Sequence, residues 1–260
     1  MEVWKAAVLG IVQGITEFLP VSSSGHLILF ERMLGAETGG ADMFLGIMLH
    51  AGTLIAVLFA YAPRLREMLR HDRKKILYLI FGTIPAALVG VFLGDTVDRL
   101  FFGGDWLWLF FALTALLLLL CERRAKRARV LRPLSVKNSL AVGCAQALAV
   151  IPGLSRSGTT LAAGVFCGLE REEAADFSFL LSIPVIAGAV LVECWKAFTN
   201  TGYVSSISWQ SLLAGTLCAA VFGFLSLRLM LRSVKRGKLY PFAIYLILLA
   251  AALAAIGFFC

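Results

Sequence analysis

A glutamate and a glutamine lie one helical turn apart in an apolar stretch near the start of the chain. Glu17 follows Gln13 by four residues, so both side chains share one face if the segment is helical. A carboxylate in such an apolar segment is costly and indicates a functional site by default. A paired-acid or metal site would favour two carboxylates, whereas Gln13 supplies a neutral amide. The structural alternative is that these residues pair only with each other or with Thr16.

Three consecutive hydroxyls, a glycine and a histidine follow directly. The run reads Ser22, Ser23, Ser24, Gly25 and His26. Histidine suits proton transfer near neutral pH, and either a histidine or an activated serine can attack phosphorus. A helix-capping turn is the structural alternative, because serine caps helix starts and glycine permits tight turns. Capping needs one serine and does not explain the histidine, so we expect this run to have a function.

A second polar run, Pro152–Thr160, contains the one basic residue of its apolar segment. Arg156 in such a setting needs an anionic partner, and its planar fork suits a phosphate group. Gly153 and Gly158 allow backbone N–H groups to approach an anion, and a helix that starts near this point would direct its positive end at it. The hydroxyls that add donors are those of Ser155, Ser157, Thr159 and Thr160. The structural alternative is an ion pair between Arg156 and Glu17, which is compatible with phosphate binding.

Long apolar runs show what must position these residues. The chain is 60% hydrophobic and 15% charged, whereas soluble domains have about 45–50% apolar and about 25% charged residues. A helix needs about 20 residues to cross a bilayer. The runs that we predict to span a membrane are Ala41–Ala62, Ile76–Gly94, Trp106–Cys121, Phe177–Cys194, Leu212–Leu227 and Tyr240–Phe259.

The first polar run interrupts a shorter apolar segment. Trp4–Leu19 can form a helix, Pro20 and the serine run break it, and Leu27–Met33 resumes it. Non-helical backbone at membrane depth is tolerated only where protein or a water-filled cavity surrounds it, so we expect a re-entrant hairpin here and a second at Pro152–Thr160. The predicted fold is an all-α integral membrane protein, one domain over 1–260, with six transmembrane helices and two re-entrant helical hairpins.

Most of the basic residues behind the net charge of +8 lie in three connections between the predicted spans. Arg64–Lys75, Arg123–Lys137 and Arg228–Lys238 hold 18 of the 24 basic residues. Each cluster caps the end of a span, as the positive-inside rule expects of cytoplasmic loops. The charge therefore indicates membrane orientation, and we expect no nucleic-acid partner.

An internal repeat relates the two halves of the chain. A shift of 133 residues pairs Gln13 with Gln146 and Gly82 with Gly215. The same shift also pairs Gly10 with Gly143, Ser22 with Ser155, Ser24 with Ser157, and Gly25 with Gly158. Each half holds one hairpin and three spans, and an odd number of crossings inverts the second half. We predict a first repeat over 1–122 and an inverted second repeat over 136–260, an architecture whose sites lie near the midplane.

The two polar runs also match a known family. The chain resembles the bacterial undecaprenyl-diphosphate phosphatases, the integral-membrane family linked to bacitracin resistance. The match rests on Gln13 and Glu17 followed by Pro20–His26, and on Pro152–Thr160, and it covers the whole chain in length and span order. The resemblance implies hydrolysis of undecaprenyl diphosphate to the monophosphate, which recycles the lipid carrier for peptidoglycan and other wall polymers. It implies a multi-pass protein of the bacterial inner membrane whose site faces the periplasm or exterior.

The resemblance also implies roles for individual residues. Glu17 would bind a divalent cation, Mg²⁺ or Ca²⁺, or position water, with Gln13 as a weak further ligand. Ser23 and His26 would be the nucleophile and its proton partner, in an order that the sequence leaves open, and Arg156 would hold the diphosphate. The expected substrate-binding residues are Ser22, Ser24, Gly25, Gly153, Ser155, Ser157 and Thr160.

Two other functions stay open at this point. The inverted repeat favours a transporter, such as a flippase of polyprenyl phosphate, whereas the Ser, His and Arg set favours an enzyme, because transport needs no nucleophile. A non-catalytic subunit or lipid sensor would leave Glu17, His26 and Arg156 without a purpose. Membrane lipid surrounds the protein in each case, and the oligomeric state is open, with a homodimer as one option.

Overall fold

The computed structural model is an assembly of α-helices, and it describes residues 1–36, 40–101, 103–127, 131–199 and 207–257. These residues contain no β-strand, which confirms the predicted all-α class. The helices are α1 (Val3–Phe18), α2 (Ser23–Met33), α3 (Gly40–His71), α4 (Arg73–Phe101), α5 (Leu107–Arg127), α6 (Val136–Leu148), α7 (Arg156–Phe166), α8 (Arg171–Thr199), α9 (Trp209–Lys235) and α10 (Tyr240–Ile256). Residues 258–260, with which the last predicted span and the second repeat end, lie outside the described ranges.

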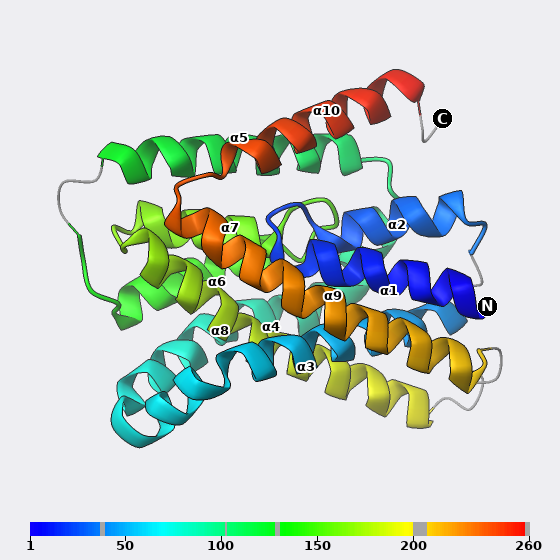
Figure 1. Ribbon diagram of the computed structural model, residues 1–260, viewed down its shortest axis with the longest axis horizontal. Helices are drawn as coiled ribbons and strands as arrows, with labels where there is room; N and C mark the ends of the chain where they lie inside the picture. The colour runs from blue at the N-terminus through cyan, green and yellow to red at the C-terminus, as the bar shows by residue number, and fades with distance from the viewer. Residues whose placement is uncertain (37–39, 102, 128–130, 200–206, 258–260) are drawn as a thin grey trace.

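Two short helical hairpins enter the molecule from opposite ends. Helices α1 and α2 form the first and α6 and α7 the second, and in Figure 1 their tips lie close together halfway along the long axis. The longer helices pack around them: α9 and α3 lie beside α1, and α4 lies beside α6. This arrangement brings the two polar runs together, although they are far apart in sequence.

Within the described ranges, four helices are long and apolar enough to cross a bilayer. They are Phe44–His71 in α3, Arg73–Gly94 in α4, Arg171–Val192 in α8 and Trp209–Lys235 in α9. Helix α10 is apolar but has 17 residues, and the last turn of α5 carries three basic side chains. The protein is therefore an all-helical membrane protein, and the predicted number of six spans stays a prediction.

Helix α2 begins earlier than the sequence suggests. The interruption was predicted to last until Leu27, but the helix already starts at Ser23. The reason is a cap: Ser22 is the N-cap residue, and its side chain accepts a hydrogen bond from the backbone N–H of Gly25. The break is thus confined to a few residues before Ser23, and Ser23 and His26 are placed on the first turn of a helix.

Close glycine contacts join each hairpin to a long helix. A Cβ atom built on Gly10 of α1 would lie 2.2 Å from the carbonyl oxygen of Gly215 in α9. One built on Gly143 of α6 would lie 2.3 Å from the carbonyl oxygen of Gly82 in α4. The shift of 133 residues relates these two contacts, and small residues commonly allow such close approach in membranes. The matching contacts support the internal repeat, which we propose as the origin of the fold.

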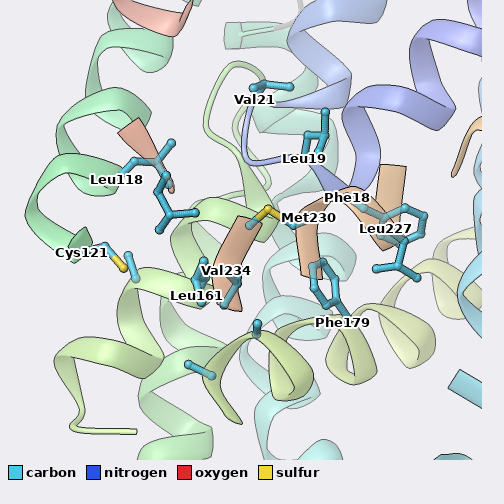
Figure 2. Packing of buried hydrophobic residues seen from close by; sticks show 14 of the residues in the cluster. Phe18, Leu19, Val21, Leu118, Cys121, Leu161, Phe179, Leu227, Met230 and Val234 are labelled. Carbon is cyan, nitrogen blue, oxygen red and sulfur yellow. The ribbon is translucent and has the colours of Figure 1, made fainter. Parts of the chain in front are cut away.

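The core lies beneath the hairpin tips and joins the two halves. Figure 2 shows Phe18, Leu19 and Val21 of the first hairpin above Phe179 of α8 and Leu227 of α9. Phe18 and Phe179 pack edge to face with ring centroids 6.1 Å apart. Because the tip of the first hairpin rests on helices of the second half, the core fixes where the polar run lies.

The basic connections gather at one end of the molecule. In Figure 1, the end of α3, the end of α5 and the end of α9 all lie toward the left. The beginning of α1 and the end of α10 lie toward the right. This common placement agrees with the prediction that the three clusters share one side of the membrane.

Candidate active site

The Glu17 carboxylate is the centre of the polar cluster at the hairpin tips. It is 6% exposed and accepts hydrogen bonds from Gln13 Nε2 at 2.9 Å and Ser23 Oγ at 2.7 Å. Its other oxygen pairs with the guanidinium of Arg156. Gln13 and Arg156, both predicted as partners, therefore meet at this carboxylate together with Ser23, whereas Thr16, the other predicted partner, donates to the carbonyl of Val12.

Arg156 comes from the opposite hairpin, at the first residue of α7. Its Nη2 donates to Glu17, whereas its Nη1 is buried and has no protein hydrogen-bond partner within the described ranges. Buried donors are nearly always satisfied in folded proteins, so an orphan such as this one needs an explanation. An acceptor oxygen on a bound anion would provide it, and the positive end of α7 lies at the same place.

The two hairpin tips are joined directly by hydrogen bonds. The backbone N–H of Gly153 donates to Ser22 Oγ at 3.1 Å, and Ser157 Oγ donates to the carbonyl of Leu19 at 3.0 Å. Gly25 has no room for a side chain, because a Cβ there would lie 2.7 Å from Phe111 Cζ and 3.1 Å from Gly153 Cα. The joint fixes Arg156 relative to Glu17, and it requires the small residues of both polar runs.

Ser22 adopts a conformation that is rare for a residue with a side chain. Its φ is 70°, and it is the one non-glycine residue with positive φ in the described parts of the chain. Such a conformation costs on the order of 1–3 kcal/mol and is often found at functional sites. Hydrogen bonds hold it in place: Oγ accepts from Gly25 and Gly153, and the carbonyl pairs with His26.

His26 belongs to the same tip but not to the Glu17 cluster. Its Nδ1 lies 2.7 Å from the carbonyl oxygen of Ser22, and its Nε2 lies 2.7 Å from the hydroxyl of Tyr245 in α10. The two rings stack with centroids 5.7 Å apart. Among the described residues, no hydrogen bond joins His26 to Ser23 or Glu17, so in this state the hydroxyl next to the carboxylate is that of Ser23.

Most of the other predicted substrate contacts are engaged within the protein. Ser155 caps α7, because its Oγ accepts from the N–H of Gly158 at 3.2 Å. Thr160 is fully buried, and its hydroxyl donates to the carbonyl of Arg156 and pairs with Ser178. Ser24 is partly exposed, and its Oγ lies 3.4 Å from that of Ser22. These hydroxyls build the frame that holds Arg156 and Ser23.

Three residues at the site were not singled out as functional from the sequence. His50 of α3 pairs through Nδ1 with the carbonyl of Gly46 in its own helix, and its Nε2 lies 3.9 Å from Glu17 of α1. Thr114 of α5 donates to the carbonyl of Gly153 and accepts from the N–H of Ser155. Tyr245 pairs with His26. Each of the three is a polar residue in an apolar helix, and this was the sequence feature that could have identified it as part of the site.

The oxygen atoms around Glu17 can hold a hard cation such as Mg²⁺ only if a bound substrate supplies further oxygen ligands. No group of three His, Cys, Asp or Glu side chains that could hold a metal occurs among the residues described. Glu17 offers one carboxylate, and Gln13 Oε1 is a buried oxygen without a hydrogen-bond partner. Mg²⁺ is commonly held by one or two carboxylates together with substrate phosphates and water, so these two residues fit such an ion.

Comparisons with known proteins find the same family that the two polar runs indicate. The model of a family described as bacitracin resistance protein BacA matches residues 6–252. An undecaprenyl-diphosphatase of Halothermothrix orenii is 39% identical over 94% of each chain. An undecaprenyl-diphosphatase of Carboxydothermus hydrogenoformans is 35% identical over 97% of each, and one of Methanosphaera stadtmanae is 38% identical over 94% of each.

Proposed function

Because the chain belongs to the bacitracin resistance protein BacA family, we propose that it hydrolyses undecaprenyl diphosphate to undecaprenyl phosphate and inorganic phosphate. The names of its relatives support this substrate, and the similarity extends over nearly all of both chains. The observation that carries the proposal is the hydrogen bond from Ser23 to the buried Glu17, with Arg156 on the same carboxylate. The enzyme would thereby recycle the lipid carrier of cell-wall polymer synthesis.

Arg156 is the residue that we propose to bind the diphosphate. Its Nη1 is a buried donor without a protein partner, and its planar fork can hold two phosphate oxygens. Phosphoryl transfer depends mainly on positioning and on neutralising negative charge. The substrate would compete with Glu17 for the guanidinium, and this exchange would leave the carboxylate available for proton transfer.

Ser23 is the proposed nucleophile, with Glu17 as its base. The Ser23 hydroxyl already donates to the carboxylate at 2.7 Å, within the reach required of a general base. Its oxygen would attack the terminal phosphorus, its proton would pass to Glu17, and the bond to the bridging oxygen would break to release undecaprenyl phosphate. Water would then hydrolyse the phosphoserine and release inorganic phosphate. Protonated His26, held by Tyr245, would supply a proton to the departing oxygen and regain one from the water that hydrolyses the phosphoserine, while Glu17 returns its proton to Ser23.

A divalent cation, Mg²⁺ or Ca²⁺, is the cofactor that we propose for this site. Glu17 would hold it with the phosphates of the substrate, and Gln13 would contribute weakly through Oε1. When bound, the ion would neutralise charge on the diphosphate. The protein groups would still supply the nucleophile and the guanidinium.

We also propose that α5 and α10 complete a set of six spans and that the protein resides in the inner, or cell, membrane. The three basic clusters would face the cytoplasm. The first hairpin, which opens toward the other end in Figure 1, would then open toward the exterior or periplasm. The site would receive its substrate from that side.

A phosphate-release assay tests the proposed activity. Purified protein with Mg²⁺ should release inorganic phosphate from a polyprenyl diphosphate, and Arg156→Ala or His26→Ala should abolish the release. Unchanged release in both variants would contradict the assignment of the site. Movement of polyprenyl phosphate across the membrane without phosphate release would favour a transporter, which has no use for the hydroxyl held against Glu17.

A further inference from the structure

A basic pocket lies at the end of the molecule where the three basic connections gather. Its volume is about 570 Å³, and it forms where α5 ends, α6 begins and α7 ends. Figure 1 places these helix ends at the left, away from the hairpin tips that hold Glu17. The cationic side chains that line it are those of Arg124, Arg127, Arg132 and Lys137. The proposed hydrolysis uses none of these residues.

The charges in this pocket are not balanced by the protein. Among the described residues, no acidic side chain lines the pocket, and none of the four cations forms an ion pair. Nearby cations behave differently, because Lys126 and Arg171 both lie within 4 Å of the buried carboxylate of Glu122, at 3.8 Å and 3.2 Å. The four cations therefore repel one another, and an anion would relieve this repulsion.

The helix that starts in the pocket adds to the positive potential. Ser135 caps α6, and Lys137 lies in its first turn, which contains no acidic residue. The N-terminal end of a helix carries a partial positive charge, so a lysine there is unfavourable unless an anion is bound. The helix end and the lysine thus attract the same kind of ligand as the arginines.

The pocket is held in shape by the backbone. The N–H of Arg132 donates to the carbonyl of Gly168 at 2.8 Å, and the Arg132 side chain lies against that glycine. Gly168 has a φ of 93°, which disfavours a residue with a side chain. Asn138 anchors the other wall through a bond from Nδ2 to the carbonyl of Pro133 at 3.2 Å. These bonds fix the backbone around the pocket, and the four cationic side chains lie exposed at it.

Part of the lining is apolar, which restricts the class of ligand. Phe166 of α7 lines the pocket and is 42% exposed, and Ala141 of α6 also lines it. An anion with an adjoining hydrocarbon chain would satisfy both the cations and this apolar surface. Basic pockets between transmembrane helices on the cytoplasmic side commonly hold anionic lipid headgroups.

We propose that this pocket binds the phosphate group of an anionic lipid at the membrane face opposite the Glu17 site. Free inorganic phosphate presents the same chemistry, since both offer negatively charged oxygens to arginine. The apolar lining favours the lipid. Such a ligand would hold the end of α5 against the beginning of α6 by bridging their cations.

Binding of fluorescent phosphatidylglycerol to the purified full-length protein in neutral detergent tests the proposal. The double variant Arg127→Gln/Lys137→Gln should bind about 25-fold more weakly, because each basic residue near an anionic lipid contributes about fivefold. The matched control is Arg73→Gln/Lys74→Gln, which removes the same charges from exposed positions outside the pocket. It should bind the lipid like the unaltered protein, and both variants should retain the thermal midpoint.

Competition distinguishes the two sources of phosphate. If inorganic phosphate at millimolar concentration displaces the lipid and phosphatidylcholine does not, the pocket recognises the phosphate oxygens, as proposed. If inorganic phosphate fails to displace it, the site requires the intact anionic lipid, which also supports the proposal. Equal losses in the two double variants, or no loss in Arg127→Gln/Lys137→Gln, would overturn it.

Discussion

The Glu17 carboxylate accepts hydrogen bonds from Gln13 and Ser23 of its own hairpin and forms an ion pair with Arg156 of the other hairpin. A buried carboxylate with one arginine and two neutral donors is well satisfied, so the arrangement is stable before substrate binds. Removing one member of a buried ion pair typically costs about 3–5 kcal/mol, because the other charge is left uncompensated. Loss of activity in Arg156 variants must therefore be separated from loss of folding.

The serine run offers a cleaner test, because neighbouring hydroxyls have different partners. Ser23→Ala should lower the rate of phosphate release at least about 100-fold, because it removes the nucleophile and with it the proton transfer to Glu17, which alone contributes about 100-fold or more. Ser24→Ala should lower it less than about tenfold, because Ser24 Oγ lies near Ser22 and has no carboxylate partner in the described part of the chain. Single-turnover phosphate release measures both rates. A larger loss in Ser24→Ala than in Ser23→Ala would contradict the choice of Ser23 as nucleophile.

Close glycine contacts hold the hairpin helices against the long helices. Helix α6 approaches α4 so closely that a Cβ on Gly143 would nearly coincide with a backbone carbonyl. If α6 moved away from α4, the tip of its hairpin would move with it. The position of Arg156 is thus coupled to packing at the far side of α6.

Alanine substitutions should distinguish glycines that pack closely against another helix from glycines with open space beside them. Gly143→Ala and Gly10→Ala should each destabilise the protein by about 1–3 kcal/mol, because overpacking forces the helices apart. Gly90→Ala should be neutral or slightly stabilising, because among the described residues no atom beyond its own stretch of helix lies within 4 Å of its Cβ position and alanine favours helix. Thermal unfolding in detergent measures all three. Equal midpoints for Gly143→Ala and Gly90→Ala would show that α6 and α4 are not in close contact.

At the scale of the whole molecule, the two hairpins open to opposite ends while their tips share one site. Figure 1 shows this inversion directly, and the equivalent glycine contacts of α1 and α6 agree with it. Folds with inverted repeats place ligands near the membrane midplane. The basic connections determine which end faces the cytoplasm.

Epitope insertion in cells tests that orientation. A tag between Asp72 and Arg73, within a basic connection, should be inaccessible from outside intact cells. A tag between Gly103 and Gly104, at the other end of α4, should be accessible, because one span separates the two sites. Antibody labelling before and after permeabilisation measures both. The reverse pattern would place the Glu17 site on the cytoplasmic side.

Several features of this protein follow from its sequence because their causes are local. Apolar runs predict helices, Pro20 and the serines predict a break, and an arginine in an apolar segment predicts an anionic partner. Trp4–Leu19 was predicted as a helix, and α1 occupies Val3–Phe18. The start of α2 was missed, because the choice of Ser22 as the cap depends on its bonds to two glycines.

Only the tertiary structure decided which polar groups meet. Arg156 and Glu17 are 139 residues apart, and their pairing requires both hairpin tips to be held by close glycine contacts. Ser23 and His26 lie three residues apart in one polar run, but they have different partners. His26 contacts Tyr245, whereas Ser23 contacts Glu17. Residue type and spacing identify groups that can do chemistry, but hydrogen-bond partners depend on distances of a few ångströms that packing alone determines.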